Sequence, residues 1–134
     1  MNILIIDAQG GGIGKQLVSS VKESFPDAVI TAVGTNSTAS SAMLRAGADH
    51  AATGENAVVV GCRKADVIIG PIGIVITDSL YGEITEKMAA AVGKSNAKRI
   101  LIPVSQCDNI IAGVQNGNIN YLIKCVIEEI KKFC

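Results

Sequence analysis

Three observations on the sequence predict an α/β fold. Hydrophobic residues make up 49% of the chain but aromatic residues only 3%, so the core must be built from Ile, Val, Ala and Leu, which suits β-branched parallel strands covered by helices. Apolar runs of strand length alternate with segments of helical period, and a glycine-rich stretch joins the first run to the first helical segment. This pattern predicts a Rossmann-like three-layer α/β/α sandwich with a mostly parallel sheet of about five to six strands. Because the chain has 134 residues, we expect one domain over residues 1–134.

Five segments are expected to form strands. Four of them are apolar runs, and the other is a short segment that begins at His50. They cover residues 3–6, 28–34, 50–52, 66–70 and 99–104. Because the strands alternate with helical segments, we expect parallel strands joined by right-handed crossovers.

The first two helices are predicted by their apolar faces and their ends. The first helix follows the glycines, has apolar residues on one face from Ile13 to Phe25, and stops at Pro26. The second begins at Asn36 or Ser37, either of which is a candidate N-cap, and ends at Gly47, which can take the left-handed conformation.

Three further helices are expected along the chain. Residues 54–65 read as a short helix with Thr53 as its cap, although residues 58–60 alone would suit a strand equally well. Residues 82–96 carry acids early and lysines late, in agreement with the helix macrodipole. An apolar stripe over residues 122–133 follows the candidate cap Asn118 and predicts a helix that packs on the sheet.

Charge and cysteine usage exclude several classes of partner. Twelve basic residues balance twelve acidic ones, so no global field would hold nucleic acid or an anionic membrane surface. No apolar run is long enough for a signal peptide core or a membrane span. None of the four cysteines belongs to a C-x-x-C pair, so neither a zinc site nor a redox dithiol is expected. We expect a cytoplasmic protein with reduced thiols.

The stretch LIIDAQGGGIGKQLV, residues 4–18, predicts a binding site for a phosphate. It contains Gly10, Gly11, Gly12 and Gly14, four glycines in five positions, between a strand and a helix start. Such a turn presents unpaired amide groups at the positive end of the helix dipole and lets a phosphate approach the backbone. We therefore assign residues 10–14, including Ile13, to cofactor binding. The alternative is that the glycines only allow a tight turn and close packing of the helix.

The motif does not fit the loops of ATPases. The Walker A pattern G-x-x-x-x-G-K-[ST] aligns through Gly14 and Lys15, but Gln9 replaces its first glycine and Gln16 its hydroxyl residue. ATP hydrolysis is therefore disfavoured. S-adenosylmethionine ranks no higher, because Asp7 lies one residue too far upstream for a methyltransferase loop.

Dinucleotide motifs fit in part and favour NADP. G-x-G-x-x-G fails because Lys15 stands at its last position, whereas the G-x-x-x-G-x-G spacing of short-chain dehydrogenases fits at Gly12 and Gly14 with Ala8 in place of the first glycine. Their Tyr-x-x-x-Lys pair is missing, since Thr85 follows Tyr81 at that spacing, which excludes this enzyme class. No acid follows the second strand to bind the ribose of NAD; neutral groups at residues 34–37 favour NADP instead.

Other loops should complete the site. In an open parallel sheet, ligands bind beyond the carboxyl ends of the strands, so we expect the loops after residues 3–6, 66–70 and 99–104 to converge. We expect further contacts from residues after two of the strands: Thr35, Asn36, Ser37, Gly70, Pro71 and Ile72.

Catalytic residues stay unassigned. Asp78, Glu83 and Asp108 are candidate bases, and Ser105 and Cys107 are candidate nucleophiles, but the sequence gives none of them an activating partner. The lone histidine, His50, reads as a surface or packing residue. For two further side chains we favour structural roles: Asp7 should order the glycine turn, and Cys107 should be a small, partly buried side chain. Asp78 and Ser79 could instead cap the following helix.

The chain resembles a small bacterial family known only as a domain of unknown function. The resemblance rests on NILIIDAQGGGIGKQL, ITAVGTNSTASSAMLRAGADHAATGENA, ADVIIGPIGIVI and RILIPVSQCDNIIAGV, which together span most of the sequence. It implies a single Rossmann-like domain and supplies no activity, substrate or catalytic residue. ADVIIGPIG is also similar to the fourth strand and following loop of nicotinamide-dependent dehydrogenases, which again favours NADP.

Two functions from different classes remain open. The first is binding of a small-molecule nucleotide or dinucleotide, with NADP favoured, by an enzyme or a sensor that we expect to be a homodimer. The second is a regulatory or assembly subunit in which the glycines only shape a turn and the C-terminal helix or the long loop after residue 70 binds a partner.

Overall fold

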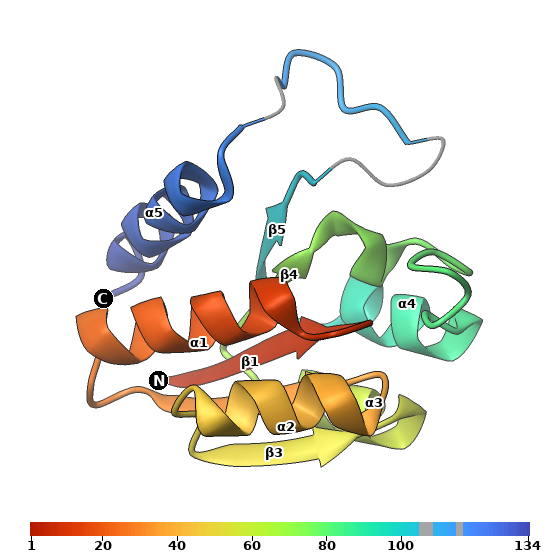
Figure 1. Ribbon diagram of the computed structural model, residues 1–134, viewed down its shortest axis with the longest axis horizontal. Helices are drawn as coiled ribbons and strands as arrows, with labels where there is room; N and C mark the ends of the chain where they lie inside the picture. The colour runs from red at the N-terminus through yellow and green to blue at the C-terminus, as the bar shows by residue number, and fades with distance from the viewer. Residues whose placement is uncertain (105–108, 115–116) are drawn as a thin grey trace.

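The computed structural model describes residues 1–104, 109–114 and 117–134 and contains a five-stranded parallel sheet (Figure 1). Its strand order is β3-β2-β1-β4-β5. The bounds are β1 Asn2–Asp7, β2 Val29–Gly34, β3 His50–Thr53, β4 Val67–Pro71 and β5 Lys98–Ile102. All four strand pairings are parallel, so the carboxyl ends of the strands lie at one edge. The predicted α/β fold with a parallel sheet is confirmed.

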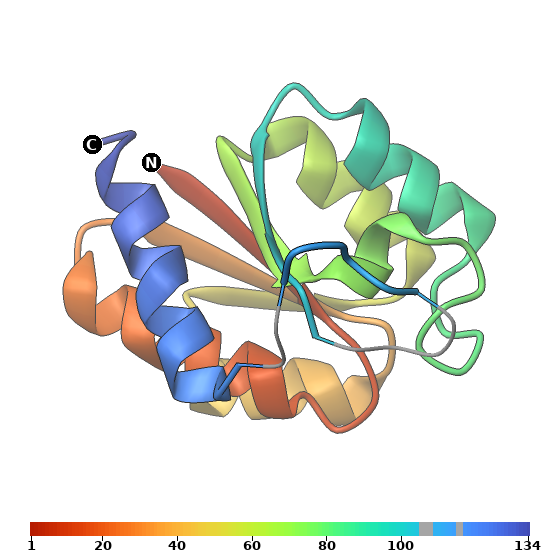
Figure 2. The ribbon, with the colours of Figure 1, turned by 90° about the horizontal axis from the view of Figure 1, so that it is seen from above.

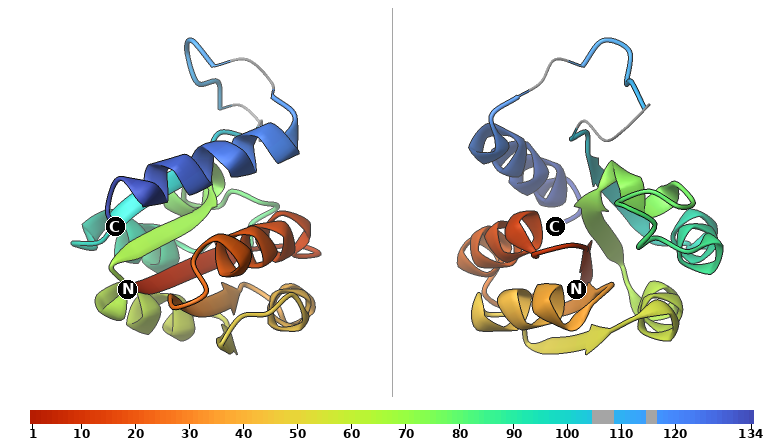
Figure 3. Two further views of the ribbon diagram at one scale, coloured as in Figure 1. Left: turned by 90° about the vertical axis from the view of Figure 1, so that its left-hand side faces the viewer. Right: turned by 45° about the vertical axis from the view of Figure 1, so that its right-hand side comes forward.

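Five helices cover the two faces of this sheet (Figure 2). Helices α1 (Gly12–Ser24), α2 (Ser37–Arg45) and α5 (Ile119–Lys131) lie on one face. Helices α3 (Glu55–Lys64) and α4 (Glu86–Lys94) lie on the other. Figure 3 shows the same three layers from the side, with the two groups of helices separated by the sheet.

The central strand β1 divides the core into two clusters. Ile3 and Ile5 belong to the cluster under α1, α2 and α5, whereas Leu4 and Ile6 belong to the cluster under α3 and α4. All four side chains are at most 1% exposed, because successive residues of a strand point to opposite faces and both faces are covered here. This explains why the strand is a continuous apolar run.

Two predicted helix caps, Asn36 and Asn118, are confirmed, whereas Thr53 is not a cap. Asn36 caps α2 by accepting a hydrogen bond from the Ala39 N–H at 3.0 Å, and the side chain of Asn118 accepts one from Asn120 at the start of α5. Thr53 is not the cap of α3: it ends β3, its hydroxyl pairs with that of Ser40, and α3 begins after Gly54 without a side-chain cap. Residues 58–60 are helical.

The start of α4 corrects another expectation. Asp78 and Ser79 do not cap α4, because the cap is Thr85, whose hydroxyl accepts a hydrogen bond from the Met88 N–H at 3.2 Å. The Ser79 hydroxyl instead donates to the carbonyl of Gly73. Ile74 lies in the short 3-10 helix η1, Ile72–Val75, which follows β4, and is buried in the same cluster as Leu80.

The loop between η1 and α4 has an unusual main chain. Asp78, Leu80 and Tyr81 all have φ between 56° and 64°, a region that L side chains rarely adopt. Three hydrogen bonds close the loop on itself: Asp78 N–H to the Ile84 carbonyl, Ile84 N–H to the Ser79 carbonyl, and Gly82 N–H to the Asp78 carbonyl. The buried side chains of Leu80 and Ile84 anchor it in the core under α4. A strained conformation held by these contacts fixes the direction of Glu83, which lies in the same loop two residues after Tyr81.

Helix α5 uses its apolar stripe in the core. Ile123, Val126 and Ile130 are buried against α1 and the sheet, as expected for a helix that packs on the sheet. Phe133 lies beyond the helix and is 42% exposed. Within the described ranges, no helix has the length and the apolar character needed to cross a membrane.

The contact between β2 and α2 predicts a stability defect. A Cβ atom on Gly34 would lie 2.5 Å from the Ser40 nitrogen and 2.7 Å from the Asn36 carbonyl oxygen, both main-chain atoms that cannot move independently. We expect Gly34→Ala to lower the free energy of unfolding by about 1–3 kcal/mol in urea denaturation. The matched control is Gly93→Ala in α4, where the new Cβ meets nothing within 4 Å. It should be neutral or stabilise by up to about 1 kcal/mol. Equal stability of the two variants would contradict this packing.

Candidate functional site

The loops after β1, β2 and β4 meet at the carboxyl edge of the sheet. Gln9 and Asn36 are joined by a hydrogen bond of 2.9 Å from the Asn36 amide to the Gln9 carbonyl, and Glu83 from the loop after η1 contacts both of them. The prediction that the loops after β1 and β4 converge is confirmed by these contacts. The predicted third loop, after β5, covers residues 105–109, of which 105–108, including Ser105, Cys107 and Asp108, lie outside the described residues.

Asp7 organises the glycine turn from below. It ends β1, is 5% exposed, and its two carboxylate oxygens accept hydrogen bonds from Ala8 N–H at 2.8 Å and Gly14 N–H at 2.7 Å. Burial raises the pKa of Asp7, the two main-chain hydrogen bonds oppose that shift, and the charge of Glu83 adds a smaller rise. The structural role expected for Asp7 is confirmed.

The four glycines of the turn fall into two groups. Gly11 has φ of 73°, and a Cβ there would lie 2.9 Å from Ala39 Cα. A Cβ on Gly14 would lie 2.6 Å from the sulfur of Met43 and 2.8 Å from Asp7 Cβ, so these two glycines serve packing. Gly10 and Gly12 are exposed, neither has a left-handed φ, and a Cβ on either would meet nothing within 4 Å. The fold therefore gives no reason for glycine at these two positions.

Unpaired main-chain donors surround the two open glycines. Among the described residues, none accepts a hydrogen bond from the N–H groups of Gly10, Gly12 or Ile13. Gly12 and Ile13 are the first two residues of α1, which has 13 residues, so their N–H groups lie at the positive end of its dipole. The surface beside Gly10 and Gly12 is thus both sterically open and rich in donors for an anion.

Glu83 is the feature of this site that the sequence does not reveal. Its Oε1 atom accepts hydrogen bonds from the Thr35 hydroxyl and the Asn36 amide, each at 2.7 Å. The Gln9 N–H is shared between Oε1 at 3.2 Å and Oε2 at 3.1 Å. One carboxylate therefore ties the loop after β4 to the loops after β1 and β2.

These hydrogen bonds decide the charge state of Glu83. Burial alone would raise the pKa of this carboxyl, but the hydrogen bonds from Thr35, Asn36 and Gln9 together outweigh it and lower the pKa. Glu83 is therefore ionised at neutral pH. It places a negative charge beside the end of β2, where the sequence shows none.

The remaining predicted binding residues lie at the same edge in different surroundings. Gly70 serves packing, because a Cβ there would lie 2.5 Å from the Ile6 carbonyl oxygen. Ser37 is exposed at the first position of α2, and Pro71 ends β4. Ile72 lines a hollow of about 270 Å³ beyond the ends of β4 and β5, with Pro103, Val104, Asn109, Ile110, Ile111 and Val114.

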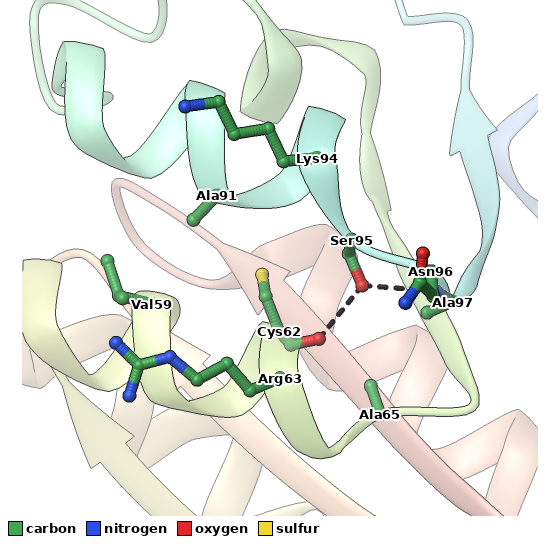
Figure 4. A pocket seen from close by; sticks show the side chains of 9 residues that line it. All are labelled: Val59, Cys62, Arg63, Ala65, Ala91, Lys94, Ser95, Asn96 and Ala97. Atoms are coloured by element: carbon green, nitrogen blue, oxygen red, sulfur yellow. Dashed lines mark hydrogen bonds between the residues drawn. The ribbon is translucent and has the colours of Figure 1, made fainter.

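A second hollow, of about 370 Å³, lies between α3 and α4 at the opposite edge of the sheet (Figure 4). The Ser95 hydroxyl bridges its wall by donating to the Cys62 carbonyl and accepting from the Ala97 N–H. Burial raises the pKa of the Cys62 thiol to about 11, so this thiol stays protonated at neutral pH and is a poor nucleophile.

The other candidates for chemistry do not gather at the glycine loop. Asp78 is exposed on the strained loop, and His50 lies exposed at the start of β3, the outer strand of the sheet. Within the described part of the chain, no three His, Cys, Asp or Glu side chains are placed to hold a metal ion.

The sequence offers little signal for the role of Glu83. It lies 74 residues from Gln9 and 48 from Thr35, and it enters the sequence analysis only as a candidate base. The available hint is the lack of an acid after β2, which raises the question of whether another segment supplies one.

A family model described as Domain of unknown function (DUF3842) matches residues 2–134. The chain belongs to this family. This description agrees with the resemblance seen in the sequence. A comparison with curated proteins found no match.

One solved structure supports the fold. The chain is similar to the crystal structure of a dodecameric FMN-dependent Ubix-like decarboxylase from Escherichia coli O157:H7, with a TM-score of 0.50. The two share 16% identity over 98% of this chain and 76% of the other. At this identity the likeness extends to the Rossmann-like arrangement of strands and helices.

The lowered pKa of Glu83 predicts how stability depends on pH. Its contribution is fully present above the unfolded value of about 4.5 and is lost as the pH falls through the lower folded-state value. Asp7, with a raised pKa, has the opposite trend, so we compare the protein with Glu83→Gln. The melting-temperature advantage of the unmodified protein should shrink as the pH falls from about 6 to about 3. An advantage that stays constant over this range would contradict the assignment.

Proposed function

We propose that this protein binds a nucleotide or dinucleotide, with a phosphate seated on the main chain at Gly10, Gly12 and Ile13, and that residues 1–134 act as one binding domain. The observation that carries the proposal is the pair of glycines, Gly10 and Gly12, that neither packing nor backbone conformation requires. A phosphate that approaches the main chain closely supplies the missing reason.

The surroundings of the two glycines support the same proposal. Within the described part of the chain, the N–H groups of Gly10, just before α1, and of Gly12 and Ile13, at its start, have no acceptor. The loop also lies beside the point where the strand order reverses, between β1 and β4. In open α/β sheets, ligands bind at such a position, outside the carboxyl ends of the strands.

Several nucleotide cofactors are candidates for the site: dinucleotides such as NADP, the flavin nucleotide FMN, ATP and S-adenosylmethionine. The sequence favours NADP because neutral groups follow β2, but Thr35 and Asn36 donate to Glu83 in the structure, which weakens the reason for that preference. FMN is a candidate because the similar solved structure is described as FMN-dependent. ATP and S-adenosylmethionine remain alternatives for the same loop.

The contrasting function, a regulatory or assembly subunit, gains no support from α5. The apolar stripe that could bind a partner is used in the core, where Ile123, Val126 and Ile130 are buried. Homodimer formation stays a prediction.

A thermal-shift panel tests the proposal directly. The ligands are NADP, NAD, FMN, ATP, S-adenosylmethionine and inorganic phosphate. A ligand at one hundred times its dissociation constant should add about 2.7 kcal/mol to the free energy of unfolding, which raises the melting temperature by several degrees. A response to any nucleotide supports the proposal, and silence across the panel contradicts it.

The variant Gly12→Leu tests whether the nucleotide binds at the glycine loop. A side chain at this exposed position finds open space in the unliganded protein but blocks the approach of a phosphate, so binding should weaken at least about tenfold with little change in stability. Gly93→Leu is the matched control, because it places the same side chain on another open helical glycine away from the loop. Equal affinity of Gly12→Leu and Gly93→Leu for the nucleotide would show that the binding site does not lie at the glycine loop.

A further inference from the structure

We infer that Glu83 is the specificity-determining residue of the glycine-loop site and restricts it to nucleotides that carry no second anionic group at the end of β2. For dinucleotides this means NAD, with its free ribose hydroxyls, in preference to NADP, with its 2′-phosphate. The inference rests on the proposed function and adds the class of ligand to it.

The first support is the place of the carboxylate. Glu83 accepts a hydrogen bond from Gln9 N–H, and the next residue, Gly10, carries the first N–H of the proposed phosphate site, which finds no acceptor among the residues that the structure describes. On its other side Glu83 contacts Thr35 and Asn36, the two residues after β2. A nucleotide whose phosphate sits on the glycine loop and whose ribose extends toward β2 therefore passes beside this charge.

The second support is the spare acceptor capacity of Glu83. Its Oε1 atom accepts from Thr35 and Asn36, whereas Oε2 accepts only a share of the Gln9 N–H at 3.1 Å among the described contacts. A carboxylate oxygen has two lone-pair sites, so Oε2 can accept a further hydrogen bond from a hydroxyl. A phosphate at the same point offers only negative oxygens and is repelled.

The third support is that the position of Glu83 is fixed. Leu80 and Tyr81 hold left-handed φ values of 56° and 57° in the loop that delivers it. Gln9 also has a left-handed φ of 53°, with its N–H bound to Glu83 and its carbonyl bound to the Asn36 amide. Strain of this kind persists only where the surrounding structure holds it, and it concentrates at binding sites.

Two of the neutral side chains after β2, those of Thr35 and Asn36, are engaged by this arrangement. The Thr35 hydroxyl donates to Glu83, and the Asn36 amide donates to Glu83 and to the Gln9 carbonyl while its oxygen caps α2. Neither side chain has a donor left for a 2′-phosphate. Glu83 thus takes the place of the acid that the segment after β2 lacks, although it comes from a different part of the chain.

Dissociation constants for NAD and NADP test the inference in four proteins: unmodified, Glu83→Gln, Glu83→Asp and Glu86→Gln. The unmodified protein should bind NAD at least about tenfold more tightly than NADP, and the preference should shrink at high salt. Glu83→Gln should reduce the preference at least about fivefold, mainly through tighter NADP binding. Glu83→Asp keeps the charge and should keep the preference. Glu86→Gln removes an exposed acid three residues away and should match the unmodified protein.

Several outcomes would overturn the inference. They are a preference for NADP in the unmodified protein, a preference that Glu83→Gln leaves intact, and an equal loss in Glu83→Gln and Glu83→Asp, which would assign the effect to loop geometry. Binding of FMN or another nucleotide that is sensitive to Gly12→Leu, without binding of either dinucleotide, leaves the proposed function standing and removes this inference. If no nucleotide binds, both the proposed function and this inference are contradicted.

Discussion

One carboxylate, that of Glu83, joins the three loops that form the candidate site. It takes hydrogen bonds from the hydroxyl of Thr35, the amide of Asn36 and the main chain of Gln9, so the ends of β1 and β2 are held against the loop that follows β4. The loop can carry left-handed residues because this connection and the buried Leu80 and Ile84 hold its middle and its C-terminal part in place. The orientation of Gln9, and with it the start of the glycine turn, depends on the same contact.

Next to these hydrogen bonds, Asp7 sets the shape of the glycine turn. The four glycines of the turn have two different roles. The Asp7 carboxylate reaches Gly14, which brings the first turn of α1 close to the end of β1, and Gly11 and Gly14 leave the room that this close approach requires. Gly10 and Gly12 contribute nothing to that packing. The proposal that this loop binds a ligand rests on this division, because a turn shaped only by packing would need two of the four glycines.

The sequence predicts what depends on local patterns and misses what depends on distant contacts. The apolar spacing from Ile13 to Phe25 identifies α1, and the side chain of Asn36 identifies the start of α2, because periodicity and capping are local properties. Thr53, Asp78 and Ser79 are reasonable caps by residue type, but the hydroxyl groups of Thr53 and Ser79 have other partners: Thr53 pairs with Ser40 on a neighbouring element, and Ser79 with the Gly73 carbonyl within its own loop. The absence of an acid after β2 is visible in the sequence. That Glu83 fills this position is not visible, because it depends on how a strained loop folds back across the edge of the sheet.

The proposed function requires that the main chain at Gly10, Gly12 and Ile13 receives a phosphate. Titration of the isotope-labelled protein with NAD, followed through its amide proton and nitrogen resonances, tests this residue by residue. We expect the resonances of Gly10, Gly12 and Ile13 to shift and saturate together, because their N–H groups gain acceptors, while that of Gly93 in α4 stays in place. Saturable shifts confined to other parts of the chain, with these three resonances unmoved, would contradict it.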